Sequence, residues 1–306
     1  MQNVLLEKKE RLLEQAAVFK NNAGQIHELK KVLKALNANG IIPIILKGAY
    51  LSEKIYQDIG ARFFNDVDIL VRKQEFARAE NILFGLGYGY TAPERAKEAR
   101  QLGGQISFCK NNSVIDLHWD IVDLERFNRV CAINIEDFWQ RSHEIEMFEG
   151  KIRELSVEDL MLYLLLHLSL QHCFQGRKLY QDIREVLLRM GDLINWQLVV
   201  ERSKTYKVRR PVYFALFYAR KDYAVAVPED ILACLKARKN RILDWLIIRL
   251  LDKKIKPEHL DHLVMPCLLD TWKQRLTFIW GSPHGSFSYV RRSFHLIWRG
   301  LNAIIK

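Results

Sequence analysis

Apolar positions along the first 150 residues change repeatedly between helical and strand-like spacing. Residues 25–39 carry apolar side chains every three or four positions and are followed by Gly40, which predicts a helix that ends there. Residues 41–46 are wholly apolar and predict a buried strand, and residues 49–58 predict a short helix. Acidic and apolar positions alternate in residues 66–71, as expected of a strand with one buried face.

A second group of elements precedes residue 122. Helical spacing returns over residues 74–86. Residues 105–110 and 113–121 have the pattern of strands, and residues 111–112, both Asn, separate them. Because Asn tolerates positive φ, this arrangement predicts a tight hairpin. The order helix, strand, helix, strand, helix, hairpin predicts a mixed α/β sheet.

The pattern becomes helical after about residue 150. Ser156 with Asp159 three positions later has the form of a capping box, ahead of an apolar helix to about His172. Five further helical runs are predicted, at residues 179–190, 195–206, 209–223, 229–237 and 240–252. We therefore predict an α+β protein, with a small mixed sheet and N-terminal helices in residues 1–150 and an all-α domain in residues 151–306.

Composition limits the class of protein. Of the 306 residues, 49% are hydrophobic and 27% are charged, which is typical of a folded globular chain and excludes a disordered or collagen-like one. The longest apolar run, residues 160–166, is far shorter than the roughly 20 residues of a membrane-spanning helix. Charges interrupt the apolar N-terminal residues, so no secretory signal is predicted. Five Cys without a CxxC pair argue against a disulfide framework and favour the cytoplasm.

The net charge of +11 is distributed unevenly. Residues 1–150 carry a net charge of −1, and residues 151–306 carry +12. This asymmetry favours an anionic partner for the helical half, such as nucleic acid or a lipid surface, with a solvated basic face as the alternative. The tail from residue 289 to residue 306 alternates bulky aromatics with Arg. We predict that it forms a docked helix, and peripheral contact with a membrane or with RNA is the alternative.

Two acidic residues, Asp66 and Asp68, open the predicted strand at 66–71. Side chains at positions i and i+2 of a strand lie on one face, so the two carboxylates project together. A divalent cation such as Mg²⁺ relieves their repulsion, because it prefers hard oxygen ligands. The spacing is a weak signal when taken alone, since the chain contains two further acid-x-acid patterns, Asp123/Glu125 and Glu144/Glu146.

The surroundings of the first acidic pair distinguish it from the other two. It follows a predicted strand that ends in Lys47 and Gly48, and it precedes a hairpin strand with an isolated acid, Asp116. A third carboxylate on a neighbouring strand is what two-metal nucleotidyl transfer requires. Gly48 would let the backbone approach a phosphate, while Lys47 and Arg62 would neutralise its charge. His118 shares a face with Asp116, although a hydrogen-bonded structural histidine is an alternative.

Five segments together resemble a known family: LKGAYLSEKIYQDIGARFFNDVDILV, GLGYG, VIDLHWDI, LLLHLSLQH and LYQDIREVL. Over roughly residues 25–225 the chain resembles the uncharacterised bacterial nucleotidyltransferase family of the DNA polymerase β-like superfamily. The resemblance implies a polymerase β-like domain followed by a helical domain. It also implies an enzyme that uses Mg²⁺ or Mn²⁺ to move a nucleoside monophosphate from an NTP such as ATP to a hydroxyl acceptor, with release of pyrophosphate.

The resemblance also assigns roles to particular residues. It implies metal binding by Asp66, Asp68 and Asp116, and places Lys47, Gly48 and Arg62 near the triphosphate. The resemblance also matches Asp182 to a family position that faces the cleft from the helical domain, and an ion pair with Arg184 is the alternative. One departure concerns the phosphate loop, where the superfamily usually has Gly-Gly or Gly-Ser. Here Ala49 follows Gly48, and Asp66 lies 18 residues after Gly48, so a Ser hydroxyl donor is missing.

The residues leave the acceptor and two rival functions open. The acceptor is a tRNA end, a protein side chain or a small hydroxylated molecule, and the basic helical half favours a polyanion such as tRNA. Glycosyltransferases that hold a nucleotide diphosphate with Asp-x-Asp form one rival class. The other is a non-catalytic basic protein that binds RNA or a membrane.

Two histidines, His167 and His172, lie in the apolar helix of the second half. Five residues of α-helix turn the side chain by about 140°. We therefore expect that the two imidazoles cannot both bind one metal ion without distortion of the helix, and predict a structural role for them.

Overall fold

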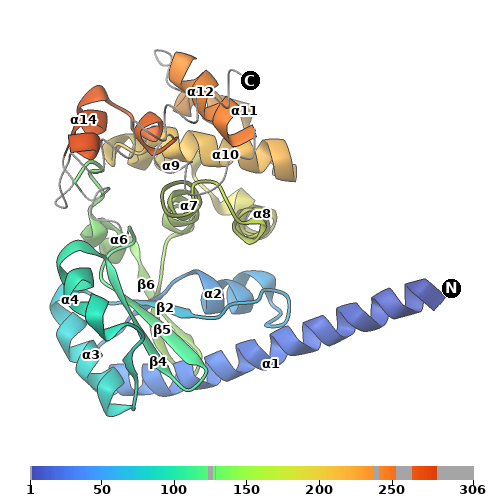
Figure 1. Cartoon of the computed structure of the whole chain (residues 1–306), viewed down its shortest axis with the longest axis vertical. Helices are drawn as coiled ribbons and strands as arrows, with labels where there is room; N and C mark the ends of the chain where they lie inside the picture. Colours follow the sequence, from blue (N-terminus) through green and yellow to red (C-terminus); the bar gives the residue numbers. More distant parts are fainter. Residues whose placement is uncertain (1, 123–126, 128, 237–240, 253–263, 281–306) are drawn as a thin grey trace. The chain divides into compact units, whose positions relative to one another are not determined.

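The computed structural model describes residues 2–122, 127, 129–236, 241–252 and 264–280 (Figure 1). The chain divides into two compact units. The sheet unit comprises residues 1–123 and 135–156, and the helical unit comprises residues 124–134 and 157–306. The predicted helix at residues 289–306 and the pair Asp123/Glu125 lie outside the described residues.

The described part of the sheet unit contains one mixed sheet of seven strands, in the order β3-β4-β5-β2-β1-β7-β6. The strands are β1 (Ile44–Ile45), β2 (Val67–Leu70), β3 (Gly89–Tyr90), β4 (Gln105–Lys110), β5 (Ser113–His118), β6 (His143–Met147) and β7 (Gly150–Glu154). The central strand β2 pairs in parallel with β5 and antiparallel with β1. At the far side of β1, β7 pairs in parallel with it. The sheet is therefore mixed, as predicted.

Helices cover both faces of this sheet (Figure 1). They are α1 (Gln2–Ala38), α2 (Lys47–Tyr50) with the π-helix η1 (Leu51–Tyr56), the 3₁₀ helix η2 (Lys73–Glu75), α3 (Phe76–Gly85), α4 (Pro93–Leu102) and α6 (Ile135–Arg141). α1 and α3 lie on one side of the sheet and α2 on the other. The C-terminal half of α1 buries Leu29, Val32, Leu33 and Leu36 almost completely, which is why its apolar spacing is clear in the sequence.

Polar side chains of α1 hold the loop that leads into β2. Asn22 Nδ2 donates to the carbonyl oxygen of Arg62 at 2.7 Å. Gln25 Nε2 donates to the carbonyl oxygens of Asn65 at 3.0 Å and Asn112 at 2.9 Å. Since backbone groups without partners are costly when buried, these bonds fix the loop directly before Asp66.

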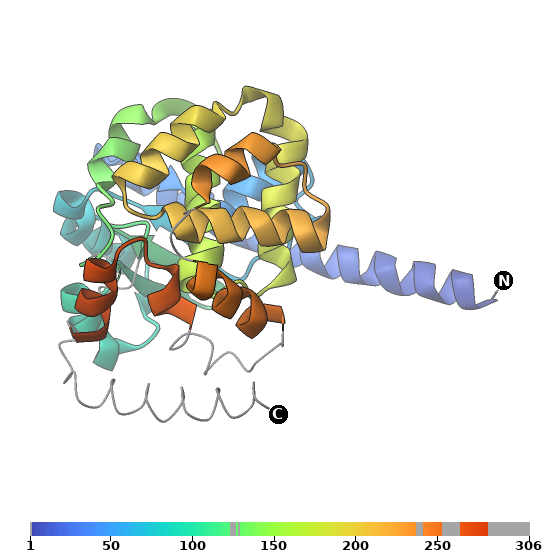
Figure 2. The ribbon, with the colours of Figure 1, turned by 90° about the horizontal axis from the view of Figure 1, so that it is seen from above.

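The described part of the helical unit is built around α7 (Val157–Leu166), in which every residue after Val157 is buried. The other described helices of the unit, drawn in Figure 2, are the π-helix η3 (His167–Gln171), α8 (Arg177–Met190), the 3₁₀ helix η4 (Gly191–Leu193), α9 (Trp196–Thr205), α10 (Arg209–Tyr223), α11 (Glu229–Leu235), α12 (Arg241–Asp252) and α14 (Trp272–Trp280). Of these, η3, α8, α9 and α10 pack against α7. The sheet followed by helices confirms the predicted α+β class.

A short segment before α6 belongs to the helical unit although it interrupts the sheet unit in sequence. Ala132 N donates to the carbonyl oxygen of Tyr206 at 2.9 Å. Gln274 Nε2 donates to the carbonyl oxygen of Val130 at 2.8 Å. The chain therefore enters the helical unit, returns to form α6, β6 and β7, and then enters the helical unit again.

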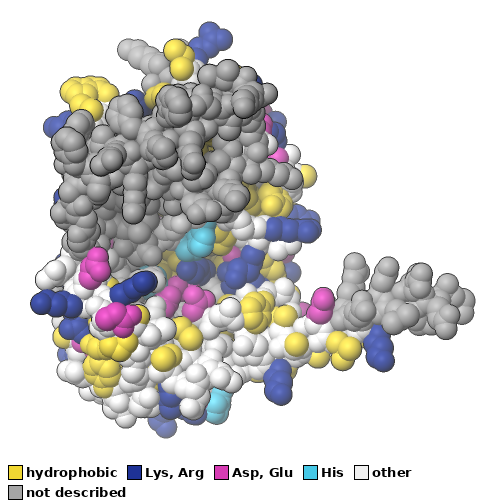
Figure 3. Space-filling model, in the orientation of Figure 1, with side chains coloured by type: hydrophobic (Ala, Val, Ile, Leu, Met, Phe, Trp, Pro, Cys, Tyr) yellow, Lys and Arg dark blue, Asp and Glu magenta, His cyan; other side chains and the backbone are white. Residues whose placement is uncertain are grey.

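Charged and apolar side chains are mixed on the described surface of the protein. On the face drawn in Figure 3, Lys and Arg side chains stand in separate groups among acidic and apolar ones. None of the described helices has the length and apolar character required to cross a membrane.

The turn after α1 gives a test of backbone conformation. Gly40 has φ of +71°, so Ala there would be strained. We expect Gly40→Ala to lower the free energy of unfolding by about 1 kcal/mol. Gly24, inside α1 with open space at its Cβ position, is the matched control. Gly24→Ala should raise stability by about 0.5–1 kcal/mol. Urea unfolding followed by circular dichroism measures both, and equal midpoints for the two variants would contradict the expectation.

Candidate active site

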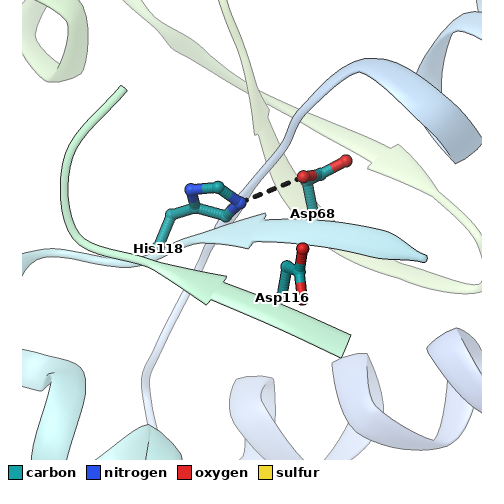
Figure 4. Close-up of side chains that lie close together, drawn as sticks. All are labelled: Asp68, Asp116 and His118. Carbon is teal, nitrogen blue, oxygen red and sulfur yellow. Dashed lines mark hydrogen bonds and ion pairs between the residues drawn. The ribbon is translucent and has the colours of Figure 1, made fainter. Parts of the chain in front are cut away.

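The acidic residues singled out in the sequence meet on two neighbouring parallel strands. β2 and β5 pair with Asp68 opposite Asp116 and with Leu70 opposite His118. One side-chain ligand atom from each of Asp68, Asp116 and His118 lies within 4.8 Å of the other two (Figure 4). These residues have relative exposures of 1%, 8% and 3%. We call them the acid–histidine cluster.

The two oxygens of Asp68 have different surroundings. Lys47 Nζ and His118 Nε2 each lie 3.0 Å from Oδ1. Oδ2 is buried and has no hydrogen-bond partner among the described residues. Burial raises the pKa of Asp68, but the charge of Lys47 and the hydrogen bond from His118 outweigh it and hold this pKa below the usual range. Asp68 is therefore a charged carboxylate with one oxygen still to be satisfied.

Asp116 has the opposite shift. Burial is the main reason why its pKa is raised, and the negative charges of Asp68 and Asp66 add to the effect. A hydrogen bond from Ser107, its neighbour on β4, lowers the pKa in part. Gln105 Nε2 also lies 3.4 Å from Oδ2. The cluster thus holds acidic groups that repel one another, as expected from the sequence.

These features fit a divalent cation. Buried carboxylates that repel one another are stabilised by a cation of this kind, and an unsatisfied carboxylate oxygen is a suitable hard ligand. Asp68 and Asp116 supply such oxygens from adjacent strands. The donor set therefore suits a divalent cation, and the identity of the metal stays a prediction.

Asp66 lies at the edge of this arrangement. It is half-buried and immediately precedes β2. Its charge contributes to the raised pKa of Asp116, which indicates that it is close to the cluster. The group of ligand atoms within 4.8 Å, however, includes His118 and not Asp66. The sequence placed His118 beside Asp116, and the structure adds its direct contact with Asp68.

Gly48 and Arg62 lie in the segments that shape the site. Gly48 is buried, and a Cβ there would come within 3.2 Å of Phe64 Cβ and 3.3 Å of the carbonyl oxygen of Asp66. Glycine is thus needed for the close approach of α2 to the loop before β2. Arg62 is buried in that loop, and its carbonyl oxygen accepts hydrogen bonds from Asn22 and Ser52. The phosphate roles of Lys47, Gly48 and Arg62 stay predictions.

Asp182 lies in the helical unit, on α8, where it is fully buried. Arg184, the ion-pair alternative considered for it, donates instead to Glu185 at 3.2 Å and is exposed. A fully buried carboxylate is rare unless it is paired. Its predicted part in nucleotide binding stays a prediction.

One further acid near the cluster was not singled out from the sequence. Asp120 continues the alternation that contains Asp116 and His118. Burial raises its pKa, while hydrogen bonds from the backbone N–H groups of Val122 and Ile121 act in the opposite direction. Its Oδ1 lies 2.7 Å from the N atom of Ile121. These bonds make Asp120 a cap for the chain as it leaves β5, and the alternation itself was the signal that could have identified it.

Comparison with known proteins defines the class. The family described as "Uncharacterised nucleotidyltransferase" matches residues 5–223, which is more than half of the chain. The chain therefore belongs to this family and is a nucleotidyltransferase, as the resemblance of its motifs implied. No curated protein matches it.

Two solved structures of the antibiotic-resistance factor ANT(2″)-Ia also match. The solution structure is 14% identical, with a TM-score of 0.41, and the match covers 66% of this chain and 97% of that chain. The crystal structure in complex with adenylyl-2″-tobramycin is 15% identical, with a TM-score of 0.40, and the match covers 60% and 97%. The family assignment rests on the family match and not on these structures.

The close approach at Gly48 can be tested by adding a methyl group. The Cβ of Gly48→Ala would press on the backbone of Asp66, so the loop must shift. Since small displacements of reacting groups are costly, we expect nucleotidyl transfer to fall about tenfold or more. Gly89→Ala, on the edge strand β3 where a Cβ meets open space, is the control. Steady-state rates compare the two, and equal activity would show that the Gly48 contact does not position the site.

Proposed function

We propose that the protein transfers a nucleoside monophosphate from an NTP to a hydroxyl acceptor in a reaction that depends on Mg²⁺ or Mn²⁺. The acceptor oxygen forms a bond to the α-phosphorus, the bond from that phosphorus to the bridging oxygen breaks, and pyrophosphate leaves. The main supporting observation is Asp68, whose Oδ1 is held by Lys47 and His118 while Oδ2 is buried without a hydrogen-bond partner in the described part of the chain. Asp116 lies opposite it on β5.

Three carboxylates would hold the cation in this proposal: Asp66, Asp68 and Asp116. When bound, the ion supplies charge neutralisation and lowers the pKa of an attacking hydroxyl. His118 fixes the orientation of Asp68 through the 3.0 Å contact between Nε2 and Oδ1. The buried surroundings of these groups exclude water and strengthen their electrostatic interactions.

Four further residues would position the nucleotide or neutralise its charge: Lys47, Gly48, Arg62 and Asp182. Lys47 is the cation nearest to Asp68, so its ammonium group is placed to balance either the carboxylate or a phosphate. Gly48 keeps α2 against the loop that carries Arg62 and leads to Asp66. Catalysis by these residues consists of positioning and charge neutralisation.

Membership of the family favours nucleotidyl transfer over the two rival functions. A sugar-transferring Asp-x-Asp enzyme does not require a third acid on the strand next to the pair, and here Asp116 occupies that position. A non-catalytic binding protein has no need of a buried carboxylate with an unsatisfied oxygen.

For the acceptor we propose a polyanion, with tRNA as the first candidate. The support is the net charge of +12 in residues 151–306. We further propose that the protein works in the cytoplasm, because none of its five cysteines forms a disulfide among the described residues.

Substitution of the cluster acids tests the reaction. Asp68→Asn and Asp116→Asn keep the side-chain shape but remove the anionic ligand. We expect transfer of label from an α-³²P NTP to fall about a hundredfold or more, as for the loss of a charge-stabilising group. Glu146→Gln is the matched control, because Glu146 is also part of an acid-x-acid pattern on a strand but is exposed. Cell extract supplies acceptors, and circular dichroism checks the fold. Unchanged labelling by Asp68→Asn would refute the site.

Salt dependence tests the acceptor class. If tRNA binds through its phosphates, the logarithm of its affinity should fall linearly with the logarithm of the salt concentration, by about 0.7–0.9 per phosphate contact. Filter binding or fluorescence anisotropy at several KCl concentrations measures the slope. A slope of zero, or no binding at low salt, would remove nucleic acid as the acceptor and leave the transfer reaction itself untouched.

A further inference from the structure

The end of α7 changes its helical geometry at His167. The π-helix η3 spans His167–Gln171, and His172 N donates to the carbonyl oxygen of His167 at 3.1 Å. This i→i+5 geometry links residues five apart by a backbone hydrogen bond and so brings His172 over His167. From the sequence we expected that both imidazoles could bind one ion only if the helix were distorted, and the π-helix is such a distortion. π-bulges of this kind are frequent at functional sites.

The two imidazoles meet at a distance typical of metal ligands. Their Nε2 atoms are 3.1 Å apart, and the ring planes are inclined at 67°. Two nitrogens at about 2.0–2.1 Å from one ion would be separated by about 2.9 Å at a right angle and about 3.4 Å at a tetrahedral angle. The observed separation lies between these values, so one ion could bind both nitrogens with little movement of either ring.

The tautomer of His167 is fixed by a neighbour on the same turn. Its Nδ1 lies against the carboxamide Oε1 of Gln171. An amide oxygen only accepts, so Nδ1 carries the proton and the neutral ring presents a lone pair at Nε2. Metal-binding histidines usually donate their second N–H to a carbonyl or carboxylate in this way. His167 therefore presents the lone pair of its Nε2 to His172.

Burial differs between the two rings in a way that suits an ion site. His167 is buried and packs near Tyr163, with ring centroids 5.8 Å apart. His172 is exposed. The inner ligand is thus held in place while the outer one leaves access from solvent. The pair belongs to the helical unit, whereas the acid–histidine cluster belongs to the sheet unit.

We propose that His167 and His172 form a second metal site, for a borderline first-row divalent ion such as Zn²⁺ or Ni²⁺. Imidazole nitrogen suits these ions, whereas Mg²⁺ prefers the oxygens of the acid–histidine cluster. Among the described residues, no third His, Cys, Asp or Glu completes a group with this pair. Water or a ligand atom of a substrate would supply the further coordination positions, as in catalytic zinc sites.

Metal titration of the full-length protein tests the site. The background is the double variant Asp68→Asn/Asp116→Asn, so that the acidic site does not contribute and no nucleotide is needed. Isothermal titration with Ni²⁺ or Zn²⁺ should show one ion per chain. His172→Ala should weaken this binding about a hundredfold, and Gln171→Ala about tenfold because the tautomer is no longer fixed. His27→Ala, at an exposed position on α1, is the matched control and should bind like the background.

A spectroscopic measurement separates a metal site from a hydrogen-bonded pair. Co²⁺ bound through imidazole nitrogen should give visible absorption in the background variant, and this absorption should be lost in His172→Ala. Circular dichroism confirms that the exposed position tolerates Ala. Unaltered affinity in His172→Ala, or no binding in the background variant, would overturn the proposal. Neither result bears on nucleotidyl transfer, because both acids of the transfer site are already replaced.

Discussion

The structure depends on the burial of two like charges on adjacent parallel strands. Asp68 and Asp116 face each other in the register of β2 and β5, where unfavourable desolvation and repulsion add together. Lys47 and His118 offset part of this cost at one oxygen of Asp68. Such an arrangement lowers the stability of the protein on its own. Buried charges of this kind are found mainly at functional sites. The position of α2 depends on the same interaction, because the first residue of α2 is Lys47, which pairs with Asp68.

Much of this could be predicted from the sequence where one physical rule dominates. The period of two in residues 66–71 placed Asp66 and Asp68 on one face, and the Asn111–Asn112 turn, with Asn111 at φ of 52°, set the β4–β5 hairpin. The helix predicted at residues 209–223 coincides with α10. Local spacing decides these elements, so the chain pattern was enough to predict them.

Other features depend on information that spacing does not carry. The hairpin of β6 and β7 turns at Phe148 and Glu149, both at positive φ, although neither residue type favours that conformation. The contact of His118 with Asp68 depends on strand register, which no local pattern gives. The meeting of His167 and His172 depends on one extra residue in a helical turn, and a helical spacing rule assumes that no such residue exists.

Between residues 124 and 156 the chain passes into the helical unit and back to the sheet unit, which affects how the protein can be divided into fragments. Ala132 forms a hydrogen bond with Tyr206 of the helical unit, and Val130 forms one with Gln274, whereas β6 and β7 complete the sheet. Neither unit is a continuous piece of sequence. A fragment that stops before this excursion loses two strands, and one that stops after it carries a segment without its partners. The two units thus alternate along the chain, so exchange of one unit for a homologous one would need three junctions instead of one.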